Sequence, residues 1–141
     1  MAADSQQTVD PEYGSGDPTM RKNAGGSGLA PNVAGALAYV FGLLSGIVML
    51  VVDGDDDFVR FHAMQSIGLS VVIFGLYLAL GILTVVLSFV PVVGRILGVL
   101  TGLLFPLLGF GGFLLWVFML YQAYQGNRFE LPIIGPFAAS N

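Results

Sequence analysis

Cysteine is absent from this 141-residue sequence, and charged residues are scarce. Without cysteine the chain can form no disulfide, no thiolate metal site and no cysteine nucleophile. Only 10% of the residues are charged and 55% are hydrophobic, whereas an ordinary soluble domain is about a quarter charged. The net charge of -4 argues against nucleic-acid binding, which needs Lys and Arg to neutralise phosphates. This composition indicates an integral membrane protein.

The N-terminal region lacks the pattern of a secretory signal, a basic segment followed at once by an apolar core. Residues 1–31 instead mix Asp, Ser, Gln, Gly and Pro without apolar periodicity. Such a composition cannot bury a core, so we expect a disordered acidic and Gly-rich tail. The first apolar run begins near Val33, and we expect Asn32 to cap its helix.

Three apolar runs follow the tail, and charges cluster between them. A bilayer core excludes charge at roughly 2.5 to 3.5 kcal/mol per residue, and about 20 apolar residues cross its ~30 Å. The sequence therefore predicts an all-α, multi-pass protein of the cell membrane. Its helical domain covers residues 32–138, with transmembrane helices at about 33–52, 63–90 and 96–124.

An acidic segment, Asp53 to Asp57, separates the first two runs. We expect it to form a turn and to cap the next helix, because carboxylates accept hydrogen bonds from free helix amides and oppose the positive end of the helix dipole. The first two turns after it, Phe58 to Gln65, hold polar residues among aromatics. These turns are expected in the headgroup layer, and Pro91 is expected to end the helix.

The third run leaves two alternatives open, because Arg95, Pro106 and a glycine cluster interrupt it. One kinked helix gives three spans, whereas a break between Pro106 and Gly112 gives four. Each half of a broken run would reach only ~22 Å, short of the ~30 Å core, so three spans are favoured. Residues 125–141 are expected to form an interfacial C-terminal segment. In the three-span arrangement, basic residues divide three to two in favour of a cytoplasmic N-terminus.

Small residues recur at four-residue spacing in the first and third runs. Such residues let helix backbones approach closely where lipid removes the hydrophobic drive for association. The pattern predicts helix packing within one bundle or between copies of the chain, through Ala38, Gly42, Gly46, Gly94, Gly98 and Gly102.

A polar stripe follows one face of the second helix. At 100° per residue from His62, the polar residues lie within roughly 80° of it; they are Gln65, Ser66, Ser70, Tyr77, Thr84 and Ser88. The stripe could line a groove or pore, or its hydroxyls could bond to carbonyls of their own helix. His62 is the only histidine, and one histidine with carboxylates is a poor transition-metal set. We expect no metal, no cofactor and no catalytic residue, so the protein is not expected to be an enzyme.

Arg60 and Arg128 lie on the same side of the membrane in the three-span arrangement. Their long side chains could reach lipid phosphates. They could instead pair with Glu130 or Asp57 and tie the C-terminal segment to the first loop.

Three strings, in this order, carry a family resemblance: NVAGALAY from Asn32, FVRFHAMQS from Phe58 and YQAYQGNRFELPIIG from Tyr121. Together they resemble the Tic-twenty-like family of small prokaryotic membrane proteins, named for a chloroplast inner-envelope protein-import component. The resemblance covers residues 32–138, and the second string is its most specific part. It implies a polytopic protein linked to protein translocation or insertion. The import component is usually drawn with four spans, and this sequence favours three.

The functional expectation is therefore an interaction or accessory subunit, linked to protein translocation or insertion. The alternatives are a homo-oligomeric channel or small-solute transporter, and a protein that organises lipid. The expected partners are the lipid bilayer and other membrane proteins or further copies of this chain, and no nucleic acid. The residues chosen for testing are Arg60, His62, Gln65, Arg128 and Pro132.

Overall fold

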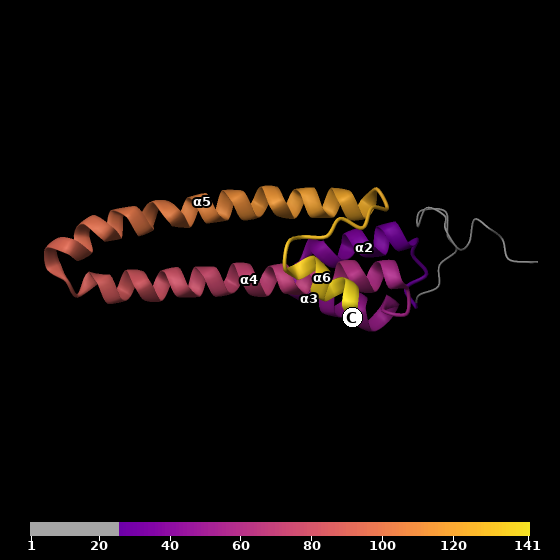
Figure 1. Cartoon of the computed structure of the whole chain (residues 1–141). Helices are drawn as coiled ribbons and strands as arrows, with labels where there is room; N and C mark the ends of the chain where they lie inside the picture. The colour runs from indigo at the N-terminus through magenta and orange to yellow at the C-terminus, as the bar shows by residue number, and fades with distance from the viewer. Residues whose placement is uncertain (1–25) are drawn as a thin grey trace, which may run out of the picture.

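The computed structural model describes residues 26–141, which form five α-helices and no strand (Figure 1). The tail predicted to be disordered is residues 1–31, and its first 25 residues lie outside the described part. The helices are α2 (Pro31–Val40), α3 (Leu43–Asp53), α4 (Asp57–Ser88), α5 (Pro91–Tyr124) and α6 (Ile134–Ser140). The predicted all-helical architecture is confirmed.

Two helices, α4 and α5, are long and apolar enough to cross a membrane. They have 32 and 34 residues, or about 48 and 51 Å at 1.5 Å per residue, and run side by side as an antiparallel hairpin (Figure 1). Only Phe89 and Val90 join them, because Pro91 starts α5 directly: its fixed φ and missing N–H suit the first helical turn. The prediction of three spans is wrong, and two helices of the described chain qualify.

The first apolar run does not form one helix, because the chain breaks at Phe41 and Gly42. Gly42 has a φ of 57° and a ψ of -116°, which a helix cannot contain and which glycine adopts without a Cβ clash. The resulting helices have 10 and 11 residues, so each reaches only about 15 Å, half of the ~30 Å core. The Ser45 hydroxyl accepts from the Phe41 N–H and donates to the Ala38 carbonyl, which satisfies backbone groups that the break leaves open.

Helices α2 and α3 form a hairpin that enters and leaves on the same side. The Gly26 N–H donates to the Val52 carbonyl at 3.1 Å, so the chain before α2 lies beside the end of α3. The outward face of the hairpin is strongly apolar, with Phe41 77% and Leu44 70% exposed, as expected for a surface in lipid. Two helices too short to span, with their outer ends together and an apolar outward face, have the form of a re-entrant element. The three-to-two count of basic residues assumed three spans and no longer applies.

The four-span alternative is wrong as well, because α5 is continuous through Pro106. Gly109 and Gly112 do not break the helix but face α4: a Cβ at these positions would lie 2.8 Å from the Tyr77 hydroxyl and 3.4 Å from Ile73. The Tyr77 hydroxyl also donates to the Phe105 carbonyl at 3.2 Å. The glycines thus allow the two spans to approach closely, as small residues do in membrane helices.

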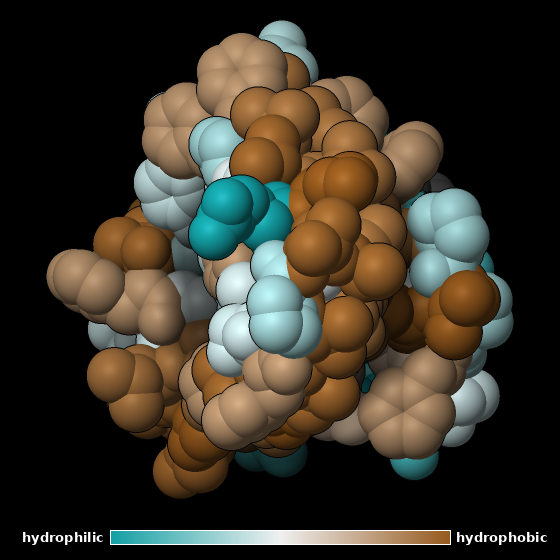
Figure 2. Space-filling model, turned by 90° about the vertical axis from the view of Figure 1, so that its left-hand side faces the viewer, coloured by the Kyte–Doolittle hydropathy of each residue, from teal (hydrophilic) through white to brown (hydrophobic). Residues whose placement is uncertain are grey.

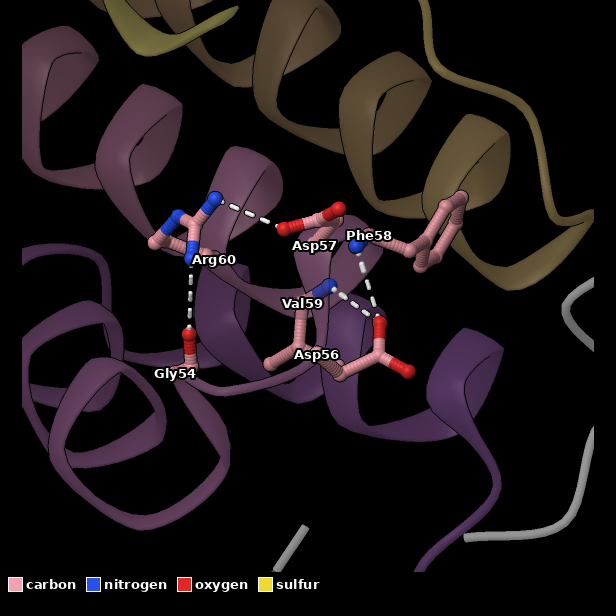
Figure 3. A network of polar contacts seen from close by, with 6 residues as sticks. All are labelled: Gly54, Asp56, Asp57, Phe58, Val59 and Arg60. Carbon is pink, nitrogen blue, oxygen red and sulfur yellow. Dashed lines mark hydrogen bonds and ion pairs between the residues drawn. The ribbon is translucent and has the colours of Figure 1, made fainter. Parts of the chain in front are cut away.

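The acidic segment caps α4 as predicted (Figure 3). The Asp56 carboxylate accepts from the amides of Phe58 at 2.8 Å and Val59 at 3.2 Å. The predicted cap of the first helix is wrong: Ala30 is the N-cap residue of α2. Asn32 lies inside the helix and donates to the Tyr124 carbonyl of α5 at 2.9 Å.

After α5 the chain turns back along α4 and ends in α6, which packs on α4 (Figure 1). Leu131, Gly135 and Ala138 are buried, so this segment, residues 125–141, is part of the protein's packing as well as its surface. Ile134 fits against Gly68, where a Cβ would lie 2.7 Å from its side chain.

The molecule therefore has two unequal ends. We call "packed end" the part made of α2, α3, residues 57–69 of α4, residues 119–124 of α5 and the C-terminal segment. We call "hairpin end" the remainder of α4 and α5. All eight buried residues of α4 lie in the packed end.

Candidate functional site

His62 is the centre of a buried polar cluster in the packed end. Its Nε2 lies 2.8 Å from the Asn127 carbonyl and its Nδ1 lies 3.1 Å from the Tyr39 hydroxyl. Because a carbonyl oxygen only accepts, the geometry assigns the proton to Nε2, and Nδ1 accepts from Tyr39. The rings of Phe58 and Phe61 pack edge-on at centroid distances of 4.6 and 5.0 Å.

Gln65 lies one turn further along α4 and uses both ends of its amide. Its Nε2 donates to the Phe129 carbonyl at 2.9 Å and to the Tyr39 hydroxyl at 3.2 Å. Its Oε1 accepts from the Leu131 N–H at 2.9 Å. His62 and Gln65 are both 0% exposed. Together they bind backbone groups of every second residue of the C-terminal segment from Asn127 to Leu131.

Further bonds link the other helices to this cluster. The Trp116 indole N–H donates to the Tyr39 carbonyl at 2.5 Å, and the Ser66 hydroxyl donates to the Ala38 carbonyl at 2.7 Å. Within residues 26–141, every buried side-chain nitrogen or oxygen has a hydrogen-bond partner. The cluster is therefore saturated, and it joins α2, α4, α5 and the C-terminal segment.

The two arginines chosen from the sequence lie at the surface of the packed end. Arg60 pairs with Asp57 at 2.7 Å and donates to the Gly54 carbonyl at 3.4 Å (Figure 3). Arg128 lies over the Phe61 ring, with its guanidinium carbon 4.6 Å from the centroid. Neither arginine touches the His62 cluster directly, but the Phe61 ring lies between Arg128 and His62.

The polar stripe of α4 does not form a continuous wall. Its first members are enclosed in the cluster, whereas Thr84 and Ser88 donate back to carbonyls of their own helix at 2.8 and 2.6 Å. Back-bonding of this kind satisfies a hydroxyl in an apolar setting. Ser70 is different, because it makes no hydrogen bond within the described residues.

The small residues predicted to pack divide into two groups. Ala38 is buried, Gly42 forms the hairpin turn, and Gly46 lies against α4, where a Cβ would come 2.9 Å from Ile67. Gly94 closes the α4–α5 turn against the Leu87 carbonyl. Gly98 and Gly102 have no atom within 4 Å of the place that a Cβ would take, so they make no close packing contact within the described chain.

Two cavities adjoin the α4–α5 hairpin. The larger, about 830 Å³, is a groove lined by aliphatic side chains and glycines of both helices, with Leu131, Pro132 and Ile134 at one end. Pro132 is thus a wall of this groove. The smaller, about 350 Å³, lies beside Gly42 and has an aromatic lining. In residues 26–141 no three His, Asp or Glu side chains converge to hold a metal ion.

Sequence reasoning missed three partners of the cluster: Tyr39, Asn127 and Trp116. Tyr39 and Asn127 belong to the strings singled out in the sequence, but a single-helix projection cannot show that they meet His62. The C-terminal contacts are made through backbone groups, which leave no trace in side-chain patterns.

Comparison with known proteins gives a consistent family. A model of the magnetosome magnetite crystal formation protein family, MamF/MmsF, matches residues 26–138. A UPF0132 membrane protein of Methanocaldococcus jannaschii is 37% identical over 111 residues, which are 79% of this chain and 87% of that protein. A UPF0132 membrane protein of Archaeoglobus fulgidus is also 37% identical, over 76% of this chain and 90% of its own length. No solved structure matches this chain.

These matches overturn the Tic-twenty-like resemblance. The three strings that carried it lie within the part matched by the MamF/MmsF model, and the relatives are named only as membrane proteins. The strings hold the packed end together, since His62, Gln65 and their partners come from them. In this chain they therefore have a packing role, and they do not by themselves indicate protein import.

Proposed function

Because the chain belongs to the MamF/MmsF family, whose relatives are membrane proteins, we propose that it is a non-enzymatic subunit that associates laterally with other proteins in the bilayer. The main support is a contrast between two parts of the molecule. The buried polar groups of the cluster are all hydrogen-bonded, whereas the apolar side chains of the hairpin end are mostly exposed. Magnetite crystal formation is the description of the family as a whole, and the proposal for this chain rests on its own surfaces.

The polar cluster supports a structural role for the residues that looked most functional. His62, Gln65 and Tyr39 are buried, and their side-chain atoms are paired with one another or with backbone groups. A catalytic group needs access to a substrate, and the enclosure of His62 and Gln65, which line neither cavity, denies it. This arrangement favours a scaffold over an enzyme.

The bare hairpin end supports an association role. Only 6% of the most apolar 18-residue window of either long helix is buried within the described chain. Seen from the α4–α5 turn, the surface is mostly hydrophobic with small hydrophilic patches (Figure 2). Lipid covers such a surface well, but the groove of about 830 Å³ interrupts it. Complementary packing against a second membrane helix gains dispersion contacts that fluid lipid gives less fully.

Two functions expected from the sequence lose their support. The link to protein translocation rested on the Tic-twenty-like resemblance, which the family match replaces. A homo-oligomeric channel or transporter needed the polar stripe as a continuous wall, and its members are separated. The first ones lie in the enclosed cluster, Tyr77 bonds to α5, and Thr84 and Ser88 bond back to their own helix, which leaves Ser70 as an isolated open hydroxyl. Lateral association needs neither feature.

Photo-crosslinking in native membranes tests the proposal. A probe at Gln65 would report only contacts inside the protein, because this side chain is fully buried. A probe at Leu76, in the groove, should capture a membrane protein reproducibly. The matched control is Leu44, which is 70% exposed on the outer face of α3 and should capture only lipid. Capture of lipid alone at both positions would contradict lateral association.

A further inference from the structure

The smaller cavity, about 350 Å³, lies between the tip of the α2–α3 hairpin, α4 and α5. Four aromatic side chains line it: Tyr39, Phe74, Tyr77 and Trp116. Its volume and its mostly apolar lining with a few polar groups are those of a small-molecule site. It is separate from the large groove, although Leu69 and Ile73 line both.

The hydroxyl groups that line this cavity differ in their hydrogen bonding. The Ser66 hydroxyl donates to the Ala38 and Gly42 carbonyls, and the Tyr77 hydroxyl donates to the Phe105 carbonyl. The Ser70 hydroxyl has no partner within residues 26–141, although it lines the same cavity. Ser70 is half-buried, and where hydrocarbon replaces water around it an unpaired hydroxyl costs free energy, so a ligand oxygen that accepts from Ser70 would be favoured.

The cavity is placed to receive a ligand from the bilayer. Helix α2 has 10 residues and is about 15 Å long, so a hairpin that starts at the membrane surface brings its tip near the middle of the ~30 Å core. Irregular backbone at that depth is tolerated where it is buried in protein or lines a cavity, which is the position of Gly42. Phe74, which also lines the cavity, is 69% exposed, so the cavity opens on an apolar part of the outer surface of α4.

We propose that this cavity binds a lipid-soluble, planar ring compound that carries a carbonyl or hydroxyl oxygen. The aromatic side chains supply faces and edges for a ring, and Ser70 supplies a hydrogen bond to its oxygen. A saturated acyl chain would fill the same space but leave the Ser70 hydroxyl without a partner. The site differs from the groove proposed for lateral association, because it lies beside the α2–α3 hairpin and its aromatic side chains and Ser70 do not line the groove.

Trp116 makes a site-specific test possible, because it is the only tryptophan of the chain and lines the cavity. The full chain is reconstituted in nanodiscs and titrated with menadione, a methylated naphthoquinone, while tryptophan fluorescence is recorded. Binding in the cavity predicts quenching that saturates. Quenching that rises linearly with the menadione concentration would show only collisions in the lipid and would overturn the proposal.

Variants separate the cavity from its surroundings. Ser70→Ala should weaken menadione binding about three- to tenfold, the effect of one hydrogen bond. Ser70→Phe should abolish saturation by filling the space, with circular dichroism confirming that the helices remain. Thr84→Ala is the matched control, because Thr84 lies on the same helix, bonds to its own backbone and does not line the cavity. Equal affinity for the native chain, Ser70→Ala and Thr84→Ala would overturn the role of Ser70 and with it this assignment.

Discussion

The packed end and the hairpin end are made from the same apolar residue types but are stabilised differently. In the packed end, short helices and an irregular segment meet around hydrogen bonds that are fully paired. In the hairpin end, two long helices satisfy their own backbones and touch through a few side chains such as Tyr77 and Phe105. Buried polar residues therefore fix the position of non-helical chain in a membrane protein, because each unpaired backbone group in a membrane is costly.

Removing the Gln65 amide from the packed end should cause the largest loss of stability. Gln65→Leu leaves the Phe129 carbonyl and the Leu131 N–H without a partner, so we expect the free energy of unfolding to fall by about 2 to 4 kcal/mol. Unfolding in mixed micelles, followed by circular dichroism, measures the change. Gln125→Leu is the control, because Gln125 is exposed at the end of α5. Equal stability of the two variants would show that the cluster does not hold the C-terminal segment.

Replacing a glycine by alanine should lower the stability in the packed end and raise it in the hairpin end. Gly42→Ala places a Cβ at a φ of 57° and 2.7 Å from the Ser70 oxygen, so we expect a loss of about 2 kcal/mol. Gly98→Ala meets nothing within 4 Å and should gain up to about 1 kcal/mol from helix propensity. Both are measured by the same unfolding assay. A destabilised Gly98→Ala would reveal a close contact at the hairpin end that the single chain does not have.

The cap of α4 offers a smaller, local effect. Asp56→Ala removes the acceptor of two helix amides and should lower the free energy of unfolding by about 1 kcal/mol. Asp55→Ala is the matched control, since Asp55 is exposed next to the cap, and should change it by less than about 0.5 kcal/mol, as surface substitutions do. If both variants behaved alike, the acidic segment would act through its charge and not as a cap.

The smallest effect is expected at the surface ion pair of the packed end. Arg60→Gln removes the bond to Asp57, and an exposed pair contributes about 0 to 1 kcal/mol. Comparing stability in low and high salt checks this, because screening should remove most of the difference. A larger, salt-independent loss would mean that Arg60 has a structural partner beyond Asp57 and Gly54.

The sequence predicted the elements that local chemistry controls. The long α4 and α5 follow from runs of uncharged residues, and the Asp56 cap follows from a carboxylate just before a helix. Hydropathy could not show the break at Gly42, because a re-entrant hairpin and a single span have the same composition. The positive φ depends on how Ser45, Ser66 and Ser70 surround the turn, which only the tertiary structure brings together.

The sequence revealed individual residues of the candidate sites but not the partners that complete them. His62 and Gln65 stood out as polar residues in an apolar helix, but their partners in the C-terminal segment are backbone atoms without a sequence pattern. The aromatic cavity joins residues of three helices, from Tyr39 to Trp116, and a helix-by-helix projection cannot find it.

Cysteine labelling from each side of the membrane tests whether α2 and α3 enter and leave on one side. The chain has no native cysteine, so Leu29→Cys, Asp55→Cys and Arg95→Cys each give a single thiol for a membrane-impermeant maleimide. We expect the cysteines at positions 29 and 55 to be labelled from the same side, and the one at position 95 from the opposite side. Labelling of position 29 together with position 95, and of position 55 from the other side, would contradict it and restore a first full span.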